Sequence, residues 1–490
     1  ITTPLSKIKQ LSKETVFYGL STILGRMLNF ILVPFYTNIF EPNEYGYVPL
    51  VYTYIAVLNM VFLYGLDSAY IKFAGRKEHK DNPNVFSTVM ISITTTTLLF
   101  GVILIVFDGF WASAIGLPAK HTNLIFWSAL TLIFDAIANI PFVYIRLKNK
   151  PLRFSINKIL FVVVNIIFNI LFIVYWGWGI EAVFISNAIA ALISLLMILP
   201  EVWSELNFKF DLELYKKIMK FGLPYLPAGM AIVLMQVVDR PIMESLTDTA
   251  TVGIYQANFR LGVFMMLFVN MFQYAWQPFF LQNAEEENAK QLFAKVFTYF
   301  TLAGVLILLV VSLFIRDLAT IQVFGKSFIG QKYWAGLDIV PLILLGFLFN
   351  GFHVVFSAGI YMKEKSSVVP FIMLAGVLVT IIGNYLLIPI YGMMGSAVTV
   401  TLAYFLIAVL FYVVTQKAYK IPYDYKTLGF IFLSLATVTL LYFSFVHYFN
   451  QWLLFYKLFL VLIFVAQLFL FKVFSPRELD FIRKKLLRRE

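Results

Sequence analysis

Cysteine is absent from the 490-residue sequence, and charged residues make up only 13% of it. Without cysteine the chain can form no disulfide and offers no thiolate to a metal, although this absence does not identify the compartment. A soluble globular domain carries roughly 25% charged residues, so the shortage of charge excludes that class. The chain must therefore be solvated mainly by lipid.

Apolar residues make up 61% of the sequence, and the mean hydropathy is +0.84. Apolar runs of about 20 residues recur along the chain, and each can cross a bilayer core of roughly 30 Å as a helix. The alternating segments of about ten residues that mark a transmembrane barrel do not occur. We therefore expect an all-α polytopic membrane protein with about 14 transmembrane helices. The expected spans are 14–39, 45–66, 85–107, 122–145, 155–175, 179–200, 221–239, 251–278, 293–315, 338–361, 367–388, 392–416, 427–448 and 451–473.

Lysine and arginine are distributed unevenly between alternate loops. Thirty of the 38 lie in one set of loops and in the segment from Lys472 to Arg489. Loops rich in these residues stay cytoplasmic, so we expect both termini in the cytoplasm. Anionic membrane lipids then account for the net charge of +12, and nucleic acid is not needed as a partner. The other set of loops holds only Lys120, Arg240, Arg316, Lys326 and Lys332.

One sequence pattern occurs twice. The segment 169–183, NILFIVYWGWGIEAV, recurs without a gap as NYLLIPIYGMMGSAV at 384–398. Each copy joins two spans through a short turn with a glycine, Gly177 or Gly392, and Asn169 and Asn384 are expected to hydrogen-bond across helices. The alternative is that such turns are simply common between apolar helices, which explains a match of this length less well. A six-helix unit used twice in the same orientation is a transporter architecture in which two bundles rock around a central cavity.

The repeat divides the chain. We expect a first six-helix bundle at 1–200 and a second at 221–418, joined by an amphipathic interdomain linker at 201–220 that lies on the cytoplasmic interface. Two extra helices, 13 and 14, occupy 419–474. Residues 475–490 are expected to form a basic cytoplasmic tail helix that begins with Pro at its first position. Pro224 and Pro227 open the seventh span and favour a bend there, which makes them a candidate hinge.

Two arginines lie deep inside the expected spans. Arg26 is about 18 Å from the cytoplasmic end of the first span, and Arg260 is about 14 Å from the outer end of the eighth. A charge inside a span costs about 2.5 to 3.5 kcal/mol, so both are functional candidates. An ion pair with Asp67, Asp135, Glu181 or Asp239 is the structural alternative. Two guanidinium groups that converge from opposite bundles would suit a diphosphate, because guanidinium binds phosphate oxygens bidentately.

Carboxylates inside or near the spans are weaker candidates. Asp135 lies deep in the fourth span, and Asp239 lies at the end of the seventh. Either is a candidate for coupling to H⁺ or Na⁺, whereas Asp239 in its interfacial position could also serve only as a cap. We expect no catalytic residue, no metal site and no cofactor. The GKS at 325–327 lacks the first glycine of a phosphate-binding loop and would face the outside, so no ATPase is encoded in this sequence.

Taken together, these segments resemble the multidrug/oligosaccharidyl-lipid/polysaccharide exporter superfamily, and within it the bacterial oligosaccharide flippases of the Wzx type. The resemblance rests on GLSTILGRMLNFILVPFYTNIFEPNEYG in the first span, RLKNKPLRF after the fourth, DRPIMESLTDTATVGIYQANFRLG across the seventh and eighth, and the repeat. It implies two six-helix bundles in a V shape. It also implies alternating-access translocation of undecaprenyl-diphosphate-linked oligosaccharides, the units of O-antigen lipopolysaccharide, capsule or exopolysaccharide, across the inner membrane of a bacterium.

Two other branches of the superfamily stay open. Lipid II flippases of peptidoglycan synthesis carry cavity arginines in the first, second and eighth helices; Arg26 and Arg260 match two of these, but the second span has no arginine. Cation-coupled multidrug antiporters usually carry an acidic residue in the first helix, which is missing from the apolar body of this one. A membrane enzyme or a scaffold is the remaining class. The resemblance favours a transporter, with polysaccharide polymerases and glycosyltransferases as candidate partners.

Overall fold

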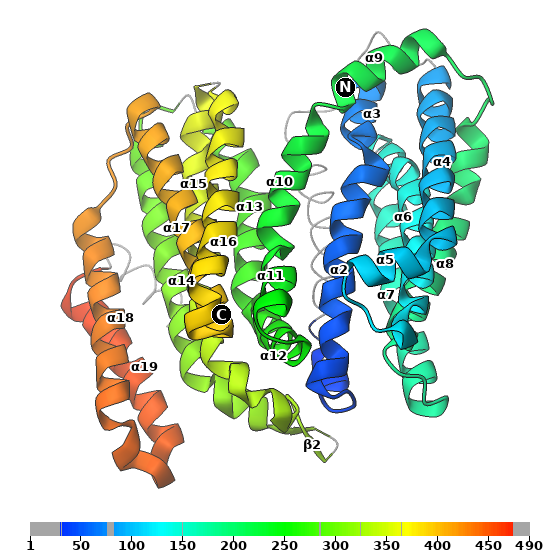
Figure 1. The fold of residues 1–490 in the computed structure, drawn as a ribbon. Helices are drawn as coiled ribbons and strands as arrows, with labels where there is room; N and C mark the ends of the chain where they lie inside the picture. The colour runs from blue at the N-terminus through cyan, green and yellow to red at the C-terminus, as the bar shows by residue number, and fades with distance from the viewer. Residues whose placement is uncertain are drawn as a thin grey trace, which may run out of the picture. The chain divides into compact units, whose positions relative to one another are not determined.

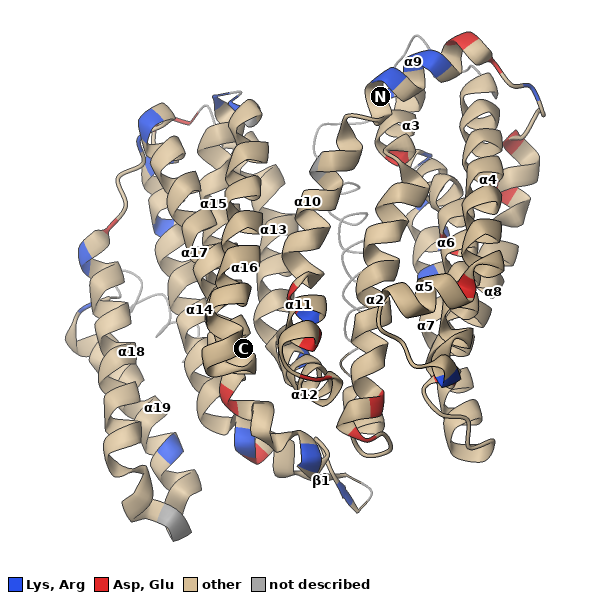
Figure 2. Ribbon diagram, in the orientation of Figure 1, with Lys and Arg blue, Asp and Glu red and all other residues tan. Residues whose placement is uncertain are grey.

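The computed structural model describes residues 30, 32–75, 83–148, 150–283, 286–323, 325–363 and 365–473. These residues are almost entirely helical, and the only strands among them are β1, Gln322–Val323, and β2, Lys326–Ser327. Figure 1 shows the long helices. Charged residues lie mostly near the helix ends, with long uncharged stretches between them (Figure 2). This distribution is the one that a lipid environment requires.

The chain forms two compact units. The first comprises Ile1–Val263, Gly325–Gly336 and Met373–Thr399, and the second comprises Phe264–Phe324, Leu337–Ile372 and Val400–Glu490. The first therefore takes in segments from both halves of the sequence. The division into bundles at 1–200 and 221–418 stays a prediction.

Residues 32–37 are helical, and the elements that follow in the first unit run as far as residue 262. They are α2 (Pro42–Leu63), α3 (Leu66–Gly75), α4 (Pro83–Val106), α5 (Asp108–Ala114), η1 (Ala119–His121), α6 (Asn123–Leu147), α7 (Pro151–Ile170), η2 (Leu171–Tyr175), α8 (Glu181–Glu205), α9 (Leu212–Gly222), α10 (Tyr225–Val237), α11 (Asp239–Leu246), α12 (Thr249–Phe259) and η3 (Arg260–Gly262).

The later elements are also helices. They are α13 (Val263–Gln282), α14 (Ala289–Thr320), η4 (Gln331–Ile339), α15 (Val340–Met362), η5 (Ser366–Val368), α16 (Val369–Tyr391), α17 (Met393–Ala418), α18 (Tyr425–Phe445), η6 (Val446–Trp452) and α19 (Leu453–Leu470).

The expected spans agree with the helices. Twelve helices of the described residues are long and apolar enough to cross a membrane, and the bent pair α9 and α10 makes a thirteenth candidate. Together they correspond to thirteen of the expected spans. The remaining one, 14–39, lies largely outside the described residues, as does the expected tail helix at 475–490. The all-helical, multi-pass architecture is therefore confirmed.

In the first unit, α6 packs against α4 and α8, and α7 packs against α8. The core between them includes Leu132, Ile140 and Ile198. A polar seam joins α7 to α8: the Asn157 Nδ2 donates to the Ser194 carbonyl at 2.9 Å, and the Ser194 hydroxyl donates back to Asn157 Oδ1 at 2.5 Å. Polar groups of this kind can associate helices in lipid, where apolar packing alone gives little preference.

The helix in the linker is shorter than expected. We expected one amphipathic helix over 201–220, but α8 continues through Pro200 to Glu205, and α9 begins only after Asp211. Asp211 caps α9, because its side chain accepts a hydrogen bond from the Leu214 amide at 2.9 Å. The backbone amide of Asp211 also donates to the Thr88 hydroxyl on α4. The linker is therefore fixed to the first unit, across the ends of α3 and α4 (Figure 1).

The repeated sequence has a repeated structure. Gly177 and Gly392 both adopt left-handed backbone angles, with φ of 67° and 55°, which glycine tolerates best. The Asn169 and Asn384 side-chain amides each donate to the carbonyl four residues earlier, at 2.8 and 2.7 Å. Asn169 also accepts from the Tyr36 hydroxyl, as the predicted contact across helices requires. Within the described residues the Oδ1 of Asn384 has no such partner.

In the second unit, α14 packs against α15, and the extra helices α18 and α19 lie side by side against α14 (Figure 1). Lys457 on α19 is fully buried and pairs with Asp317 on α14. We did not anticipate this charge inside the last span. It attaches the extra helices to the unit by an ion pair as well as by apolar packing.

Candidate functional site

Arg260 is the predicted site residue that the structure places most clearly. It begins η3, directly after α12, and is half-buried in the first unit. Arg26, the second predicted arginine, lies outside the described residues. The predicted convergence of the two guanidinium groups stays a prediction.

Glycines bring α12 against α2 and so determine what Arg260 faces. A Cβ at Gly46 would lie 1.9 Å from the Thr249 carbonyl oxygen, and a Cβ at Gly253 would lie 2.2 Å from the carbonyl oxygen of Pro42. Any side chain at either position would force the backbones apart, since glycine alone permits so close an approach. The close crossing brings the α2 tyrosines within reach of Arg260.

Three tyrosines surround the guanidinium. The charge of Arg260 acts on Tyr36, Tyr45 and Tyr52, and the Tyr45 hydroxyl lies beside it. Neither the Nη1 of Arg260 nor the Tyr45 hydroxyl makes a hydrogen bond of good geometry to any described residue, although both atoms are buried. Among the described residues, no carboxylate forms an ion pair with Arg260. This arrangement offers donors to an anion, and no described carboxylate is paired with the guanidinium in its place.

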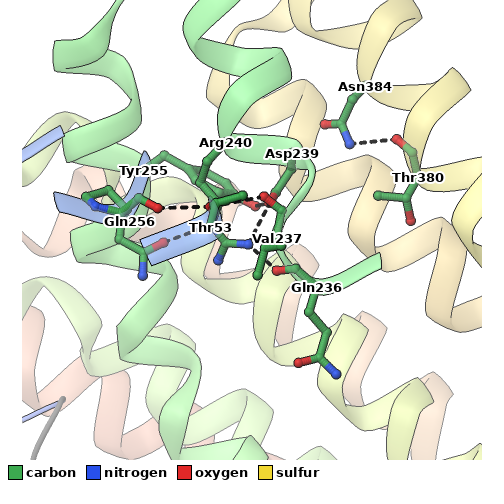
Figure 3. A network of polar contacts seen from close by, with 10 residues as sticks. Thr53, Gln236, Val237, Asp239, Arg240, Tyr255, Gln256, Thr380 and Asn384 are labelled. Atoms are coloured by element: carbon green, nitrogen blue, oxygen red, sulfur yellow. Dashed lines mark hydrogen bonds and ion pairs between the residues drawn. The ribbon is translucent and has the colours of Figure 1, made fainter. Parts of the chain in front are cut away.

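Asp239 lies in a buried polar network instead of at an open interface (Figure 3). Its Oδ1 accepts from the Arg240 guanidinium at 2.7 Å, and its Oδ2 accepts from the Tyr255 hydroxyl at 2.7 Å. Arg240 also donates to the Gln236 carbonyl and, at 3.1 Å, to the side-chain oxygen of Gln256. The predicted alternative of an ion pair between Asp239 and Arg260 does not occur.

Arg240 itself differs from its expected role as a loop residue. It is 6% exposed, and its guanidinium lies 4.9 Å from the centre of the Phe259 ring. The sequence hides this arrangement because α11 begins at Asp239 and brings its first turn inside the unit. The only feature of the sequence that pointed to this buried pair was Asp239 followed directly by Arg240 at the end of an apolar run.

Asp135 lies on α6 and is half-buried. The basic group that acts on it is Lys158 of α7, whose Nζ lies 4.0 Å from the centre of the Phe142 ring. The two side chains are too far apart for a direct salt bridge in the described structure. Asp135 therefore keeps carboxylate oxygens that a cation could still bind.

The two prolines of the seventh span lie where the helix breaks. Gly222 ends α9, Pro224 precedes α10, and Pro227 lies in the first turn of α10. The axes of the two helices differ by 40°. The predicted bend is present, whereas its use as a hinge stays a prediction. Among the described residues, no group of three or more His, Cys, Asp and Glu side chains could hold a metal ion.

Sequence reasoning missed two features. Lys457, five residues into α19, is a charge inside a span and could have been found by the same criterion that found Arg260. The tyrosines around Arg260 gave no usable signal, because the sequence contains 27 tyrosines and most of them are ordinary in a membrane protein.

Comparison with known proteins identifies relatives of this chain. The family model described as "Polysaccharide biosynthesis protein" matches residues 11–284. The Lsg locus putative protein 1 of Haemophilus influenzae is 19% identical over 413 residues, covering 80% of this chain and 97% of that protein. The capsular polysaccharide biosynthesis protein CapF of Staphylococcus aureus is 23% identical over 412 residues, covering 82% and 98%.

Solved structures show the same fold. A lipid II flippase MurJ in an inward closed conformation matches with a TM-score of 0.72 at 16% identity, covering 93% of this chain and 98% of that one. An inward-facing multidrug resistance transporter of the MATE family, from the MOP superfamily, matches with a TM-score of 0.62 at 14% identity, covering 80% and 94%. The chain thus shares the fold of these two transporters.

Proposed function

Because this chain belongs to the polysaccharide biosynthesis protein family, we propose that it is a flippase for undecaprenyl-diphosphate-linked oligosaccharides. The substrate would be a repeat unit of O-antigen, capsule or exopolysaccharide. The protein would move it from the cytoplasmic to the outer leaflet of the bacterial inner membrane by alternating access. No covalent bond is made or broken in this process, so the protein acts as a transporter and not as an enzyme.

The observation that carries the proposal is the environment of Arg260. Within the part of the chain that the structure describes, this half-buried guanidinium has an unpartnered Nη1, a tyrosine hydroxyl beside it and no paired carboxylate. Guanidinium stays protonated and matches phosphate oxygens in geometry, so an anionic headgroup is the ligand that this position fits best. In the proposal, Arg26 from the first span supplies a second guanidinium for the same diphosphate.

The proposed direction of transport follows from the charges of the loops. The loops rich in lysine and arginine face the cytoplasm, which places both termini there. An anionic headgroup that moves outward then gains about 2.3 kcal/mol per charge per 100 mV of inside-negative potential. The potential alone can therefore drive the export step.

Coupling to H⁺ or Na⁺ is assigned more readily to Asp135 than to Asp239. Both oxygens of Asp239 already accept hydrogen bonds, and Arg240 supplies its counter-charge. A coupling cation at Asp239 would have to displace that guanidinium. At Asp135 no such ion pair has to be broken.

Two alternatives give different readouts. A lipid II flippase would accept the peptidoglycan precursor, and the structural likeness to MurJ is a likeness of fold. A multidrug antiporter would export cationic drugs in exchange for cations that enter down their gradient. A basic residue at the site disfavours a cationic drug as cargo. The family relation supports the polysaccharide substrate, with a polymerase and glycosyltransferases as candidate partners in the same membrane.

Reconstitution in proteoliposomes tests the proposal. Undecaprenyl-diphosphate-linked oligosaccharide is loaded in both leaflets, and an impermeant glycosidase added outside measures how much becomes accessible. We expect the protein to raise the accessible fraction from about half to nearly all, and Arg260→Ala to prevent most of that increase.

Arg316→Ala is the matched control, because Arg316 is an exposed arginine in a surface ion pair with Asp338. It should flip the substrate at the wild-type rate. If the wild-type protein flips lipid II but no oligosaccharide-linked lipid, the substrate assignment is wrong. If it exports drugs and flips neither lipid, the antiporter alternative replaces the proposal.

A further inference from the structure

The Arg260 guanidinium lies beside one of four aromatic side chains that pack together at the end of the first unit where α2 begins. We call them the aromatic cluster: Tyr36, Phe40, Tyr45 and Tyr333. The ring of Tyr36 lies 6.0 Å from Phe40 and 5.9 Å from Tyr45, and the ring of Tyr45 lies 5.9 Å from Tyr333. All four side chains are buried. In the proposed orientation, this end of the unit faces outside.

Hydrogen bonds between residues 37–40 and residues 327–333 hold the cluster closed, and we call these bonds the clasp. The backbone amide of Gly330 donates to the Thr37 hydroxyl at 3.1 Å, and the Asn38 side-chain amide donates to the Ser327 carbonyl at 2.8 Å. The Tyr333 hydroxyl donates to the Phe40 carbonyl at 2.9 Å. A Cβ at Gly330 would lie 1.9 Å from the Thr37 carbonyl oxygen. The backbone of segment 327–333 is therefore in direct contact with the backbone of the residues that precede α2.

Within the cluster, the hydroxyl groups differ in what they bind. The Tyr36 hydroxyl is held by Asn169 at 2.8 Å, and the Tyr333 hydroxyl is held by Phe40. The Tyr45 hydroxyl makes no hydrogen bond of good geometry among the described residues, and it lies beside the Arg260 guanidinium, whose Nη1 is also without a partner there. Two groups that can donate to an anion thus lie next to each other.

An anion cannot satisfy both donors while the cluster is closed, because Tyr45 is 0% exposed. A ligand that binds only one of two conformations shifts the population toward that conformation. We propose that Tyr45 is a second donor to the diphosphate held by Arg260, and that the diphosphate, by drawing Tyr45 out of the aromatic cluster, opens the clasp between residues 37–40 and 327–333.

This inference rests on the proposed function and adds a residue and a trigger to it. Opening would depend on the charged headgroup and not on the sugars, so lipid-linked glycans of different composition would open the same clasp. Tyr36 and Tyr333 would stay anchored by their hydrogen bonds to Asn169 and Phe40. Tyr45 is the member of the cluster whose hydroxyl is not held in this way.

The experiment uses the natural absence of cysteine from the chain. A full-length variant with Asn38→Cys and Ser327→Cys is joined by a short bifunctional thiol reagent or by oxidation. We expect the cross-link to stop flipping of the undecaprenyl-diphosphate-linked oligosaccharide in proteoliposomes and a reductant to restore it. The single-cysteine variants and a pair at Asn84 and Asn207, which bond to each other between α4 and the linker, should keep flipping after the same treatment.

The rate of cross-linking tests the trigger. Undecaprenyl diphosphate should slow cross-linking of the 38/327 pair at least threefold, whereas undecaprenol, which lacks the diphosphate, should not. Tyr45→Phe keeps the ring but removes the donor, so it should abolish the effect of the diphosphate while the pair still cross-links. Arg260→Ala should do the same.

Full flipping by the cross-linked protein would overturn the gate but leave the proposed function intact. Equal slowing in wild type and Tyr45→Phe would overturn the role of Tyr45. If wild type neither flips the substrate nor responds to undecaprenyl diphosphate, the proposed function fails and this inference fails with it.

Discussion

Asp239 and Arg240, neighbours in the chain, form a buried ion pair with 2.7 Å between carboxylate and guanidinium. Breaking such a pair leaves one charge buried without a partner, at a cost of about 3–5 kcal/mol, whereas neutralising both partners costs much less. Asp239→Asn and Arg240→Gln should therefore each lower the melting temperature in detergent strongly. The double variant should be more stable than either single variant.

That result would also bear on ion coupling. If Asp239 serves only as the counter-charge of Arg240, the stable double variant should still flip substrate. Equal melting temperatures for wild type and both single variants would show that the pair contributes no stability.

Lys457 and Asp317 provide a second test. Lys457 is 1% exposed and its partner belongs to another helix, so Asp317→Asn should leave Lys457 buried without its counter-charge and weaken the attachment of α18 and α19. We expect a loss of several kcal/mol in unfolding free energy, measured as a fall in melting temperature.

Arg316→Ala is the matched control for this prediction. Arg316 and its partner Asp338 are both 63% exposed, so breaking that pair should change the unfolding free energy by about 0.5 kcal/mol or less. Similar effects of the two substitutions would mean that burial does not decide the strength of these pairs.

The sequence predicts the transmembrane spans well, but it does not predict which side chains pair between them. The reason is physical. The bilayer fixes the length of each apolar run, so thirteen expected spans match helices. A pair such as Asp317 and Lys457 joins residues 140 positions apart, and the sequence does not show which helices become neighbours. Arg240 was assigned to a loop because its neighbours are polar, yet the first turn of α11 is buried. The depth of Arg260 was readable from the sequence, whereas the tyrosines around it were not.

The two copies of the repeated sequence offer an internal comparison. Asn169 accepts a hydrogen bond from Tyr36 at 2.8 Å, while Asn384, in the described structure, bonds only within its own helix. An interhelical hydrogen bond in a membrane protein averages about 0.6 kcal/mol and reaches about 1.7. Asn169→Leu and Tyr36→Phe should each cost about this much in unfolding free energy, and the double variant no more than the larger of the two.

Asn384→Leu is the control within the repeat, and its cost should be smaller. A larger loss at Asn384 than at Asn169 would contradict the account of the repeat as a packing element with one interhelical contact.

Asp424 caps α18, outside the membrane-spanning segments. Its carboxylate accepts from the Thr427 backbone amide at 3.0 Å and from the Thr427 hydroxyl at 2.7 Å, and these bonds lower its pKa. A carboxyl with a lowered pKa stabilises the folded state above its ordinary pKa, and this contribution is lost as the pH falls through the lowered value. Asp424→Ala should cost about 1 kcal/mol in unfolding free energy near neutral pH.

The pH dependence separates the charge from the hydrogen bond. The difference in melting temperature between wild type and Asp424→Ala should shrink toward acidic pH. Asp424→Asn keeps an acceptor for the cap, so it should be less destabilising and show no such shrinkage. A difference that stays constant down to pH 3 would argue against a charged cap.

Native mass spectrometry of the purified protein tests the central claim most directly, because it detects the lipid that the site retains. We expect wild type to carry a polyprenyl-diphosphate glycan, Arg26→Ala and Arg260→Ala to lose it, and the exposed control Arg316→Ala to keep it. Unchanged retention of the glycan by Arg260→Ala would contradict the assignment of this guanidinium to the diphosphate.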